Sequence, residues 1–258
     1  MSDWPALASE LAQWQASGRP ADLWWRDDDA ADATPGLLRL LQLQRASAVP
    51  VALAVVPAAM TASLVAAIKA SPADVQVVQH GYAHFNHASD SDKKIELGPQ
   101  RPAQFVIGEI ATGKLALENA LAERVVAVLV PPWNRLAPYL VPTLPELGYA
   151  GLSQFGVRKS AMPVRGLRQV NCHLDLIDWH NGRGFIGEAA ALEVLVKHLR
   201  MRRAAWSLQA DSAAEPTGVM SHHAVHDARV WDFLARLFDA IRRHDHGRLL
   251  SARQVFLP

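Results

Sequence analysis

The chain has 258 residues, of which 50% are hydrophobic and 20% charged, and this composition excludes disordered, collagen-like and coiled-coil proteins. Its 26 lysine and arginine residues are balanced by 25 aspartate and glutamate residues, so no overall basic field would attract nucleic acid or an anionic membrane. The single cysteine, Cys172, can form neither an internal disulfide nor a thiolate metal cage. We therefore expect a globular protein that binds neither nucleic acid nor a membrane.

The sequence also carries no obvious targeting segment. No window contains the roughly 18 consecutive apolar residues of a membrane helix, and the beginning of the chain lacks the basic and apolar regions of a secretory signal. These observations predict a cytoplasmic protein. The length suits one large α/β domain or two small ones. Because no internal repeat or low-complexity linker divides the chain, we predict a single domain over residues 1–258.

Strand-like and helix-like segments alternate along most of the chain. In chain order the pattern predicts a strand at 23–25, a helix at 34–45, a strand at 49–56, a helix at 63–69, a strand at 75–78, a helix at 103–122, a strand at 125–130, a helix at 140–147, strands at 151–153 and 173–177, a helix at 188–203, a strand at 218–221 and a helix at 228–243. Nearly continuous apolar strands that alternate with helices predict an α/β protein with a parallel sheet, open or closed into a barrel.

Polar clusters follow four of the predicted strands, at the edge where parallel α/β folds place their sites. These clusters are Asp27-Asp28-Asp29, His80 to His87, Asp175 to His180, and Ser221-His222-His223. Each also has a simpler interpretation. The aspartates at 27–29 can cap a helix, and the first histidine cluster can be solvated surface. Asp175 and Asp178 can be a polar strand end, and His222 and His223 can be ordinary core or surface histidines.

His80 and His84 are four residues apart, so both imidazoles can point to the same side of one turn. With one carboxylate they would hold a tetrahedral Zn²⁺ and leave its fourth position open, as in catalytic sites. The three consecutive aspartates favour this hypothesis, because clustered carboxylates repel one another unless a cation or a proton compensates them.

Over residues 23–226 these motifs occur in an order that resembles the polysaccharide deacetylase family, the NodB-homology proteins that include carbohydrate esterase family 4. The resemblance implies a distorted (β/α) barrel with about seven parallel strands and a divalent metal, with Zn²⁺ as the expected ion. Arg26-Asp27-Asp28-Asp29 is similar to the family's T-F-D-D-G, which implies Asp27 as general base and Asp28 as metal ligand. The spacing also allows a shift by one residue, to Asp28 and Asp29.

The next two motifs are similar to the family's histidine pair and its F-R-P-P-Y-G segment. The first implies His80 and His84 as metal ligands, although Gly81 stands where the family has a hydroxyl residue. The second resembles residues 129–134, but Val130 takes the place of the arginine that orients the base. Arg26 or Arg135 could substitute for it. The implied substrate-binding residues are Pro132, Trp133, Asn134 and Trp179; Asn134 replaces a glycine and tolerates left-handed backbone.

The last two motifs concern the proton donor that the resemblance implies. Residues 175–179 are similar to the family's D-x-x-D-W, which implies that Asp175 orients the catalytic acid and Trp179 walls the acetyl pocket. Residues 219–222 resemble its L-x-H motif, which implies His222 as general acid, with His223 as the alternative. His173 and His198 lie outside any motif, so we expect them to be structural.

The resemblance implies a metal-dependent hydrolase that removes N-acetyl groups from an amino sugar or glycan. A metal-bound water would be the nucleophile, with an aspartate as base and a histidine as acid. Two alternatives stay open: hydrolysis of another small non-peptide amide on the same fold, and a catalytically silent carbohydrate-binding homologue. Both stay possible because Val130 stands where the family has an arginine.

Overall fold

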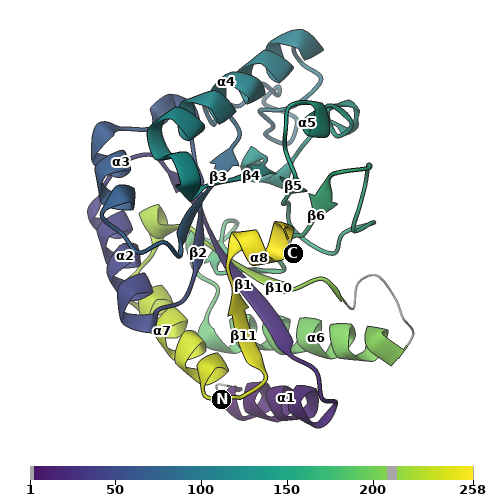
Figure 1. Ribbon diagram of the computed structural model, residues 1–258. Helices are drawn as coiled ribbons and strands as arrows, with labels where there is room; N and C mark the ends of the chain where they lie inside the picture. The colour runs from purple at the N-terminus through teal and green to yellow at the C-terminus, as the bar shows by residue number, and fades with distance from the viewer. Residues whose placement is uncertain (1–2, 208–213, 258) are drawn as a thin grey trace.

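The computed structural model describes residues 3–207 and 214–257 as a curled, parallel sheet with helices packed on its outside (Figure 1). The α-helices and strands are α1 Trp4–Ala16, β1 Ala21–Ala30, α2 Pro35–Ser47, β2 Val51–Val55, α3 Ala62–Lys69, β3 Val75–His80, α4 Ala103–Leu121, β4 Val125–Val130, α5 Thr143–Glu146, β5 Gly151–Leu152, β6 Arg168–Gln169, β7 Leu174–Asp175, β8 Ile177–Asp178, β9 Gly184–Phe185, α6 Glu188–Ser207, β10 Thr217–Ser221, α7 Ala228–Arg242, β11 Gly247–Leu250 and α8 Ala252–Phe256.

The strands of the main sheet follow the order β6-β5-β4-β3-β2-β1-β10-β7, and each neighbouring pair is parallel. β11 pairs with the first half of β1, and β2 pairs with its second half. The chain between β6 and β7 draws the two ends of the sheet together, because the N–H of Cys172 donates to the carbonyl of Gln154 and the N–H of His173 donates to that of Gly218. The expected distorted α/β barrel with parallel strands is therefore confirmed.

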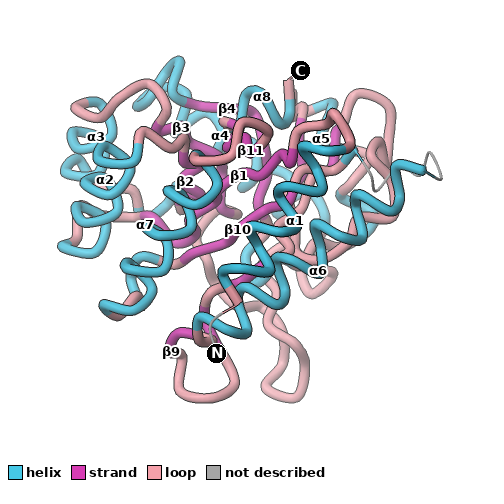
Figure 2. The backbone as a smooth tube through the Cα atoms, turned by 90° about the horizontal axis from the view of Figure 1, so that it is seen from below, coloured by secondary structure: helices cyan, strands magenta, loops and turns pink. Residues whose placement is uncertain are grey.

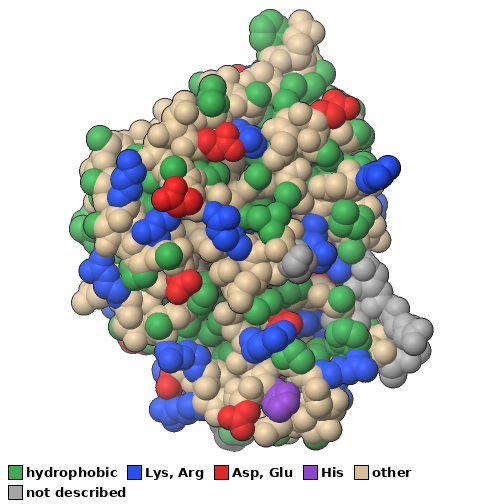
Figure 3. All heavy atoms as spheres, viewed as in Figure 1, with side chains coloured by type: hydrophobic (Ala, Val, Ile, Leu, Met, Phe, Trp, Pro, Cys, Tyr) green, Lys and Arg blue, Asp and Glu red, His purple; other side chains and the backbone are tan. Residues whose placement is uncertain are grey.

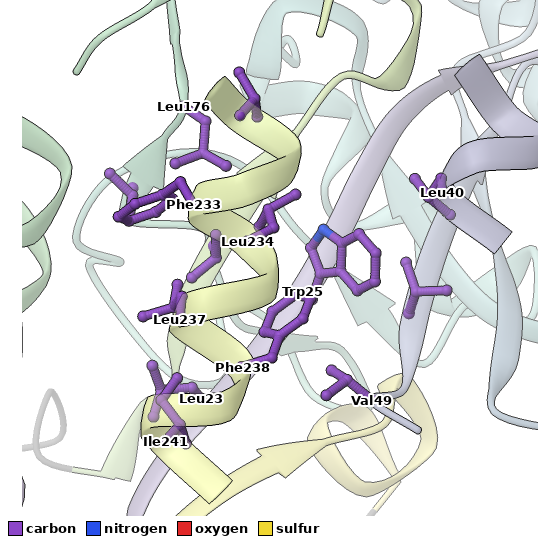
Figure 4. Packing of buried hydrophobic residues seen from close by; sticks show 14 of the residues in the cluster. Leu23, Trp25, Leu40, Val49, Leu176, Phe233, Leu234, Leu237, Phe238 and Ile241 are labelled. Carbon is purple, nitrogen blue, oxygen red and sulfur yellow. The ribbon is translucent and has the colours of Figure 1, made fainter. Parts of the chain in front are cut away.

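Side chains of β1 alternate between the outside and the inside of the barrel, as strand geometry requires. Leu23 and Trp25 point outward into the apolar layer under the helices, where the Trp25 ring lies 4.9 Å from that of Phe238 in α7 (Figure 4). Trp24 points inward and meets the Phe256 ring of α8 edge-on at 5.6 Å. The barrel interior near α8 is thus filled with apolar side chains.

Helix α8 closes the barrel at the amino ends of the strands. The N–H of Arg253 donates to the side chain of Gln76, next to the first residue of β3. Figure 1 shows α8 across the middle of the sheet, and Figure 2 shows it on the opposite side of the molecule from the loops around β9. Because this end is closed, a site that substrate can reach must lie at the carboxyl ends of the strands.

The outer helices form two flanks, with α1 beside α6 on one and α2, α3 and α7 on the other (Figure 2). Thr34 caps α2 by accepting a hydrogen bond from the N–H of Leu37. On the face that Figure 3 shows, basic and acidic side chains are interspersed. Among the helices of the described residues, none is long and apolar enough to cross a membrane.

Several elements differ from those expected from the sequence. β1 does not end at Trp25 but continues through the three aspartates to Ala30, because each carboxylate finds a partner there that offsets the poor strand propensity of aspartate. The strand expected at 173–177 is divided into β7, in the main sheet, and β8, which pairs with β9. The helix expected at 140–147 shortens to α5, and α1, β11 and α8 were not expected.

Candidate active site

Three side chains converge at the carboxyl ends of β1 and β3. Their ligand atoms all lie within 4.8 Å of one another: Asp29 Oδ1 is 3.0 Å from His80 Nε2 and 3.2 Å from His84 Nε2. His80 is the last residue of β3, and His84 lies in the loop that follows. Two imidazole nitrogens and one carboxylate oxygen at these separations form a donor set that suits a divalent metal.

A bulge in β1 brings Asp29 to this position. The pairing of β1 with β2 shifts register between Asp27 and Ala30, and Asp29 itself has a left-handed backbone with φ of 70°. The left-handed residue interrupts the alternation of side chains. Asp28 therefore points into the barrel beside Arg26, and Asp29, the next residue, also turns towards the site.

The two histidines are held from behind. His80 Nδ1 lies 3.0 Å from the carbonyl oxygen of Val130, which leaves Nε2 as the nitrogen that faces Asp29. The loop between the histidines is shaped by Glu96, a carboxylate that is 1% exposed and accepts hydrogen bonds from the N–H groups of Tyr82 and Ala83. The sequence analysis missed Glu96, because no motif contains it and only tertiary contact joins it to the site.

Charge and burial act in opposite directions on this group. Burial raises the pKa of Asp29, but the hydrogen bonds of His80 and His84 and the charges of His80 and His222 together hold it well below its ordinary value. Asp29 and His84 are 35% and 28% exposed, whereas His80 is 2% exposed. The side of the group that faces solvent is therefore the side from which a substrate can approach.

Asp28 does not join the histidines. Its two carboxylate oxygens accept hydrogen bonds from Arg26, with Nε at 2.8 Å and Nη2 at 2.9 Å. The fully buried guanidinium also donates to Ser153 Oγ at 2.8 Å and to Asn134 Oδ1 at 2.9 Å. Burial lowers the pKa of Arg26, but the charge and hydrogen bond of Asp28, with other nearby groups, together raise it above its ordinary value. A bidentate arginine thus fixes the orientation of the Asp28 carboxylate.

Position 130 is a valine, so the guanidinium beside Asp28 comes from another residue, Arg26. It reaches Asp28 because residues two apart on a strand point to the same face. Arg135, the other candidate, donates instead to the carbonyl of Lys94 at 2.7 Å on the surface. Of these two arginines, Arg26 is thus the one that lies beside the Asp28 carboxylate.

Asp27 points to the opposite face of β1, away from His80 and His84. It is fully buried and accepts hydrogen bonds from Ser221 Oγ at 2.6 Å and His223 Nδ1 at 2.5 Å. The sequence left two assignments open, Asp27 with Asp28 or Asp28 with Asp29. The structure places the second pair at the site: Asp28 contacts Arg26, and Asp29 contacts His80 and His84. The first register, with Asp27 as base and Asp28 as ligand, does not match this geometry, because strand alternation directs Asp27 outward.

His222 rather than His223 shares the site with the D-x-x-D-W motif. Its Nδ1 lies 3.8 Å from Asp175 Oδ1, and its ring meets Trp179 edge-on at 4.7 Å. The indole N–H of Trp179 donates to the other oxygen of Asp175 at 2.8 Å. Burial raises the pKa of Asp175, and the nearby His222 lowers it by less, so the net shift is upward.

The turn after β4 places the remaining predicted residues. Trp133 and Asn134 have left-handed backbones, with φ of 54° and 57°, so the expected tolerance of Asn134 for this conformation is confirmed. The Trp133 ring lies 4.5 Å from that of His84. Pro132 is buried against Gly81, where an added Cβ would meet the proline ring at 2.6 Å. Trp133 and Trp179 therefore flank the site on the sides of His84 and His222.

Among the histidines outside the metal group are His226, His173 and His198. His226 Nε2 accepts a hydrogen bond from the N–H of His222 at 3.1 Å, and burial lowers the pKa of His226 to about 4, so its ring is neutral. The rings of His173 and His198 stack 3.7 Å apart in a buried position. Burial lowers the pKa of His198 to about 2, in keeping with the structural role expected for this pair.

Comparisons with known proteins bear on the fold. A scan against protein-family models and a search of curated proteins find no match. Among solved structures, a Mycobacterium smegmatis protein provisionally assigned as a polysaccharide deacetylase aligns over 93% of this chain and 92% of its own, with a TM-score of 0.61 and 16% identity. A peptidoglycan N-acetylglucosamine deacetylase aligns over 92% and 89%, with a TM-score of 0.58 and 12% identity.

An allantoinase also aligns, over 86% of this chain and 71% of its own, with a TM-score of 0.56 and 17% identity. Several family 4 carbohydrate esterases match over about nine-tenths of the chain. At such identities the likeness concerns the fold, and all of these proteins share the curled parallel barrel described above. The chain therefore has the NodB-like fold of the polysaccharide deacetylases and family 4 carbohydrate esterases.

Proposed function

We propose that this protein is a metal-dependent deacetylase that hydrolyses the N-acetyl group of an amino sugar in a glycan. The observation that carries the proposal is the convergence of Asp29, His80 and His84 at the carboxyl ends of two strands. A peptidoglycan N-acetylglucosamine deacetylase with the same fold supports the choice of substrate class. The cytoplasmic location expected from the sequence stays a prediction.

Asp29, His80 and His84 would hold the metal, which revises the ligand set first implied by the motif. The fit rests on geometry, because three donor atoms already face one another and His80 is held by its other ring nitrogen. Two imidazoles and one carboxylate favour Zn²⁺ among common ions. When bound, such an ion supplies Lewis acidity to the substrate carbonyl and to water.

Asp28 acts as the general base that takes a proton from the attacking water. Arg26 holds both of its oxygens, so the carboxylate keeps one orientation through the reaction. The negative charge that develops on the carbonyl oxygen needs a donor. The backbone N–H of Trp133 can provide it, since no acceptor for this group occurs in the part of the chain that the structure describes.

His222 acts as the general acid that protonates the leaving amine. Asp175 lies beside this histidine, with Oδ1 at 3.8 Å from Nδ1 of the imidazole. Trp133 and Trp179 offer flat apolar surfaces on either side, against which the acetyl methyl or one face of a sugar ring can lie. The base thus comes from β1 and the acid from the residue that follows β10, the strand paired with β1.

The test combines metal content with acetate release for protein purified without chelator. We expect about one metal ion per chain and acetate release from a panel of N-acetylated sugars and oligosaccharides. Asp29→Asn should lose both the metal and the activity. Asp28→Asn should keep the metal while its kcat falls by roughly 10²- to 10⁴-fold, as for loss of a general base.

Asp32→Asn is a matched control, since Asp32 belongs to the same acidic segment but accepts hydrogen bonds from Thr61 and Ser63 away from the histidines. It should keep both metal and activity. A wild-type protein without metal would overturn the site assignment. Bound metal without acetate release from any panel member would overturn the deacetylase proposal.

A second candidate function is hydrolysis of another non-peptide amide. The allantoinase with the same fold favours this candidate, although the alignment covers only 71% of that protein. Including ureides and cyclic amides in the panel tests it directly. Hydrolysis of a ureide without acetate release would select it, and metal binding with no hydrolysis at all would point to a silent carbohydrate-binding protein.

A further inference from the structure

Asp27 is a buried carboxylate that the proposed mechanism does not use. It is fully buried on the outer face of β1 and accepts three hydrogen bonds: from Ser221 Oγ at 2.6 Å, from the backbone N–H of His223 at 3.1 Å and from His223 Nδ1 at 2.5 Å. Ser221 lies directly opposite Asp27 in the pairing of β1 with β10. One carboxylate therefore holds both chain neighbours of His222.

The surroundings of this contact leave it little room to move. The indole N–H of Trp25 donates to Ser221 Oγ at 2.8 Å. On the other side, a Cβ added to Gly36 of α2 would meet the carbonyl oxygen of His223 at 2.6 Å, so the helix packs closely on the turn. The Asp27 carboxylate and the His223 ring, 0% and 2% exposed, thus meet in a closed layer with Oδ1 at 2.5 Å from Nδ1.

The side chain of His222, by contrast, is held loosely. Its Nδ1 lies 3.8 Å from Asp175 Oδ1, beyond hydrogen-bond distance, and finds no other partner among the described residues. The chain leaves β10 at this residue, with φ of −141° and ψ of 88°. The position of the imidazole therefore depends on the backbone of the turn more than on its own contacts.

We propose that Asp27, through Ser221 and His223, is a positioning residue for the general acid His222; this inference rests on the proposed function. A buried ion pair gives little net stability compared with apolar side chains of the same size, whereas it does impose one geometry. The alternation of side chains explains how the contact acts on His222. Ser221 and His223 point outward to Asp27. His222 lies between them and therefore points inward, to Asp175 and Trp179.

The predicted consequence concerns the step that needs an acid. When the C–N bond of the amide breaks, the electron pair stays on nitrogen and a proton from His222 completes the free amine. An activated aryl acetate needs no such proton, because its phenolate is a stable leaving group. Misplacement of His222 should therefore slow amide hydrolysis and spare ester hydrolysis.

The experiment compares wild type with Asp27→Asn, which keeps the size of the side chain and removes its charge. We expect kcat for an N-acetylated oligosaccharide to fall roughly 10- to 100-fold, with KM and metal content unchanged. Activity towards 4-nitrophenyl acetate should change by less than about threefold. In the His222→Ala background, Asp27→Asn should cause no further loss, because both act through one group.

Glu10→Gln is the matched control. Glu10 is also a buried carboxylate, 2% exposed, and pairs with Arg203 at 2.7 Å between α1 and α6, far from the site. This variant should lower stability and leave the ratio of amide to ester activity unchanged. Ser221→Ala removes the hydrogen bond to Asp27 and keeps the pair of Asp27 with His223. It should show a smaller loss of amide hydrolysis with ester hydrolysis spared, and it replaces Asp27→Asn if that variant does not fold.

Equal losses on amide and ester would overturn the inference, as would a further loss in the double variant. If the wild type releases acetate from neither substrate, the proposed function fails and the positioning contact is judged by NMR. The rings of Trp179 and His222 are 4.7 Å apart, so a nuclear Overhauser effect should connect them. Its disappearance in Asp27→Asn would support the positioning role, and its persistence would overturn it.

Discussion

The inner and outer faces of β1 carry the same kinds of residue in different surroundings. On the inner face, Asp28 pairs with Arg26 in a polar interior that opens to the site. On the outer face, Asp27 pairs with His223 in a layer closed over by α2 and α7, next to the apolar packing of Trp25. Both pairs are buried and charged, yet we assign chemistry to one and positioning to the other.

This difference shows that neighbouring aspartates acquire their roles from the face they occupy. Asp27, Asp28 and Asp29 are chemically identical and consecutive. One meets a histidine outside the barrel, one meets an arginine inside it, and the last is turned to two histidines by a bulge. The partner, rather than the residue type, decides which carboxylate can act as base, as ligand or as anchor.

The largest expected effect is on the inner face. Arg26→Met leaves the buried Asp28 carboxylate without its partner, which should cost about 3–5 kcal/mol in the free energy of unfolding. Urea denaturation measures this loss. The double variant Arg26→Met/Asp28→Asn should recover part of it, because it removes the uncompensated charge.

Arg248→Met provides the comparison for that loss. Arg248 makes a similar two-pronged contact with Asp22 at the amino end of β1, at 2.6 and 2.9 Å, but it is 55% exposed. Its loss should cost about 0–1 kcal/mol. Equal costs for the two arginines would contradict the contrast between a buried and an exposed pair.

Removal of the metal should have the next largest effect. At a metal concentration about 100 times Kd, binding adds about 2.7 kcal/mol to the free energy of unfolding. The protein should stay folded without the ion, since Asp29 then contacts both histidines directly. Thermal denaturation with Zn²⁺ and with EDTA measures the difference, and Asp29→Asn should show none. Unfolding on addition of EDTA would contradict this expectation.

Gly81→Ala should have a smaller effect on stability but a specific one on the site. Gly81 has φ of 54°, and a Cβ there would meet the Glu96 carboxylate at 2.0 Å. Left-handed backbone alone costs about 1–2 kcal/mol for a residue with a Cβ. The added contact should displace the loop that carries His84 and weaken metal affinity, as measured by titration.

Gly18→Ala separates the effect of the left-handed backbone from that of the contact with Glu96. Gly18 has φ of 69° with nothing near its missing Cβ, so it shares the backbone strain without the contact. It should lose about 1–2 kcal/mol and keep its affinity for metal. Similar metal affinities in the two variants would show that Glu96 does not shape the histidine loop.

The smallest expected effect is the pH dependence of the outer pair. Burial lowers the pKa of His223, but the charge and hydrogen bond of Asp27 and the charge of Asp29 together raise it above its ordinary 6.5. The pKa of Asp27 is held below its ordinary 3.8. The pair therefore stabilises the fold fully between about pH 4 and 6.5. This contribution is lost as the pH rises through the raised pKa of His223, or falls through the lowered pKa of Asp27.

Comparison of wild type with His223→Gln isolates this contribution, because the other titrating groups cancel. The difference in the free energy of unfolding should be largest within that window and decline at higher pH. A difference that stays constant from pH 5 to 9 would contradict a charged pair on the outer face.

The sequence by itself determined much of the fold and the outline of the site. Apolar runs such as Val125–Val130 and capped amphipathic segments such as Pro35–Ser47 follow from local periodicity, and the structure has them where expected. Histidines and acids at the ends of predicted strands indicated that His80, His84 and His222 would lie at one edge, because parallel strands end together. Short elements such as β11 and α8 were missed, since their stability comes from tertiary contacts rather than from periodicity.

Only the tertiary structure decided the partner of each aspartate. Side chains in a strand alternate, so a register error of one residue exchanges inside for outside, and three identical residues give no local signal to fix it. The choice is resolved by contacts with residues distant along the chain: Asp29, turned by the bulge, meets His80, 51 positions away, and the Arg26 guanidinium meets Asn134, 108 positions away. The contacts of Glu96 with the histidine loop and of Asp27 with His223 could not be predicted for the same reason. They join residues that no local sequence pattern connects.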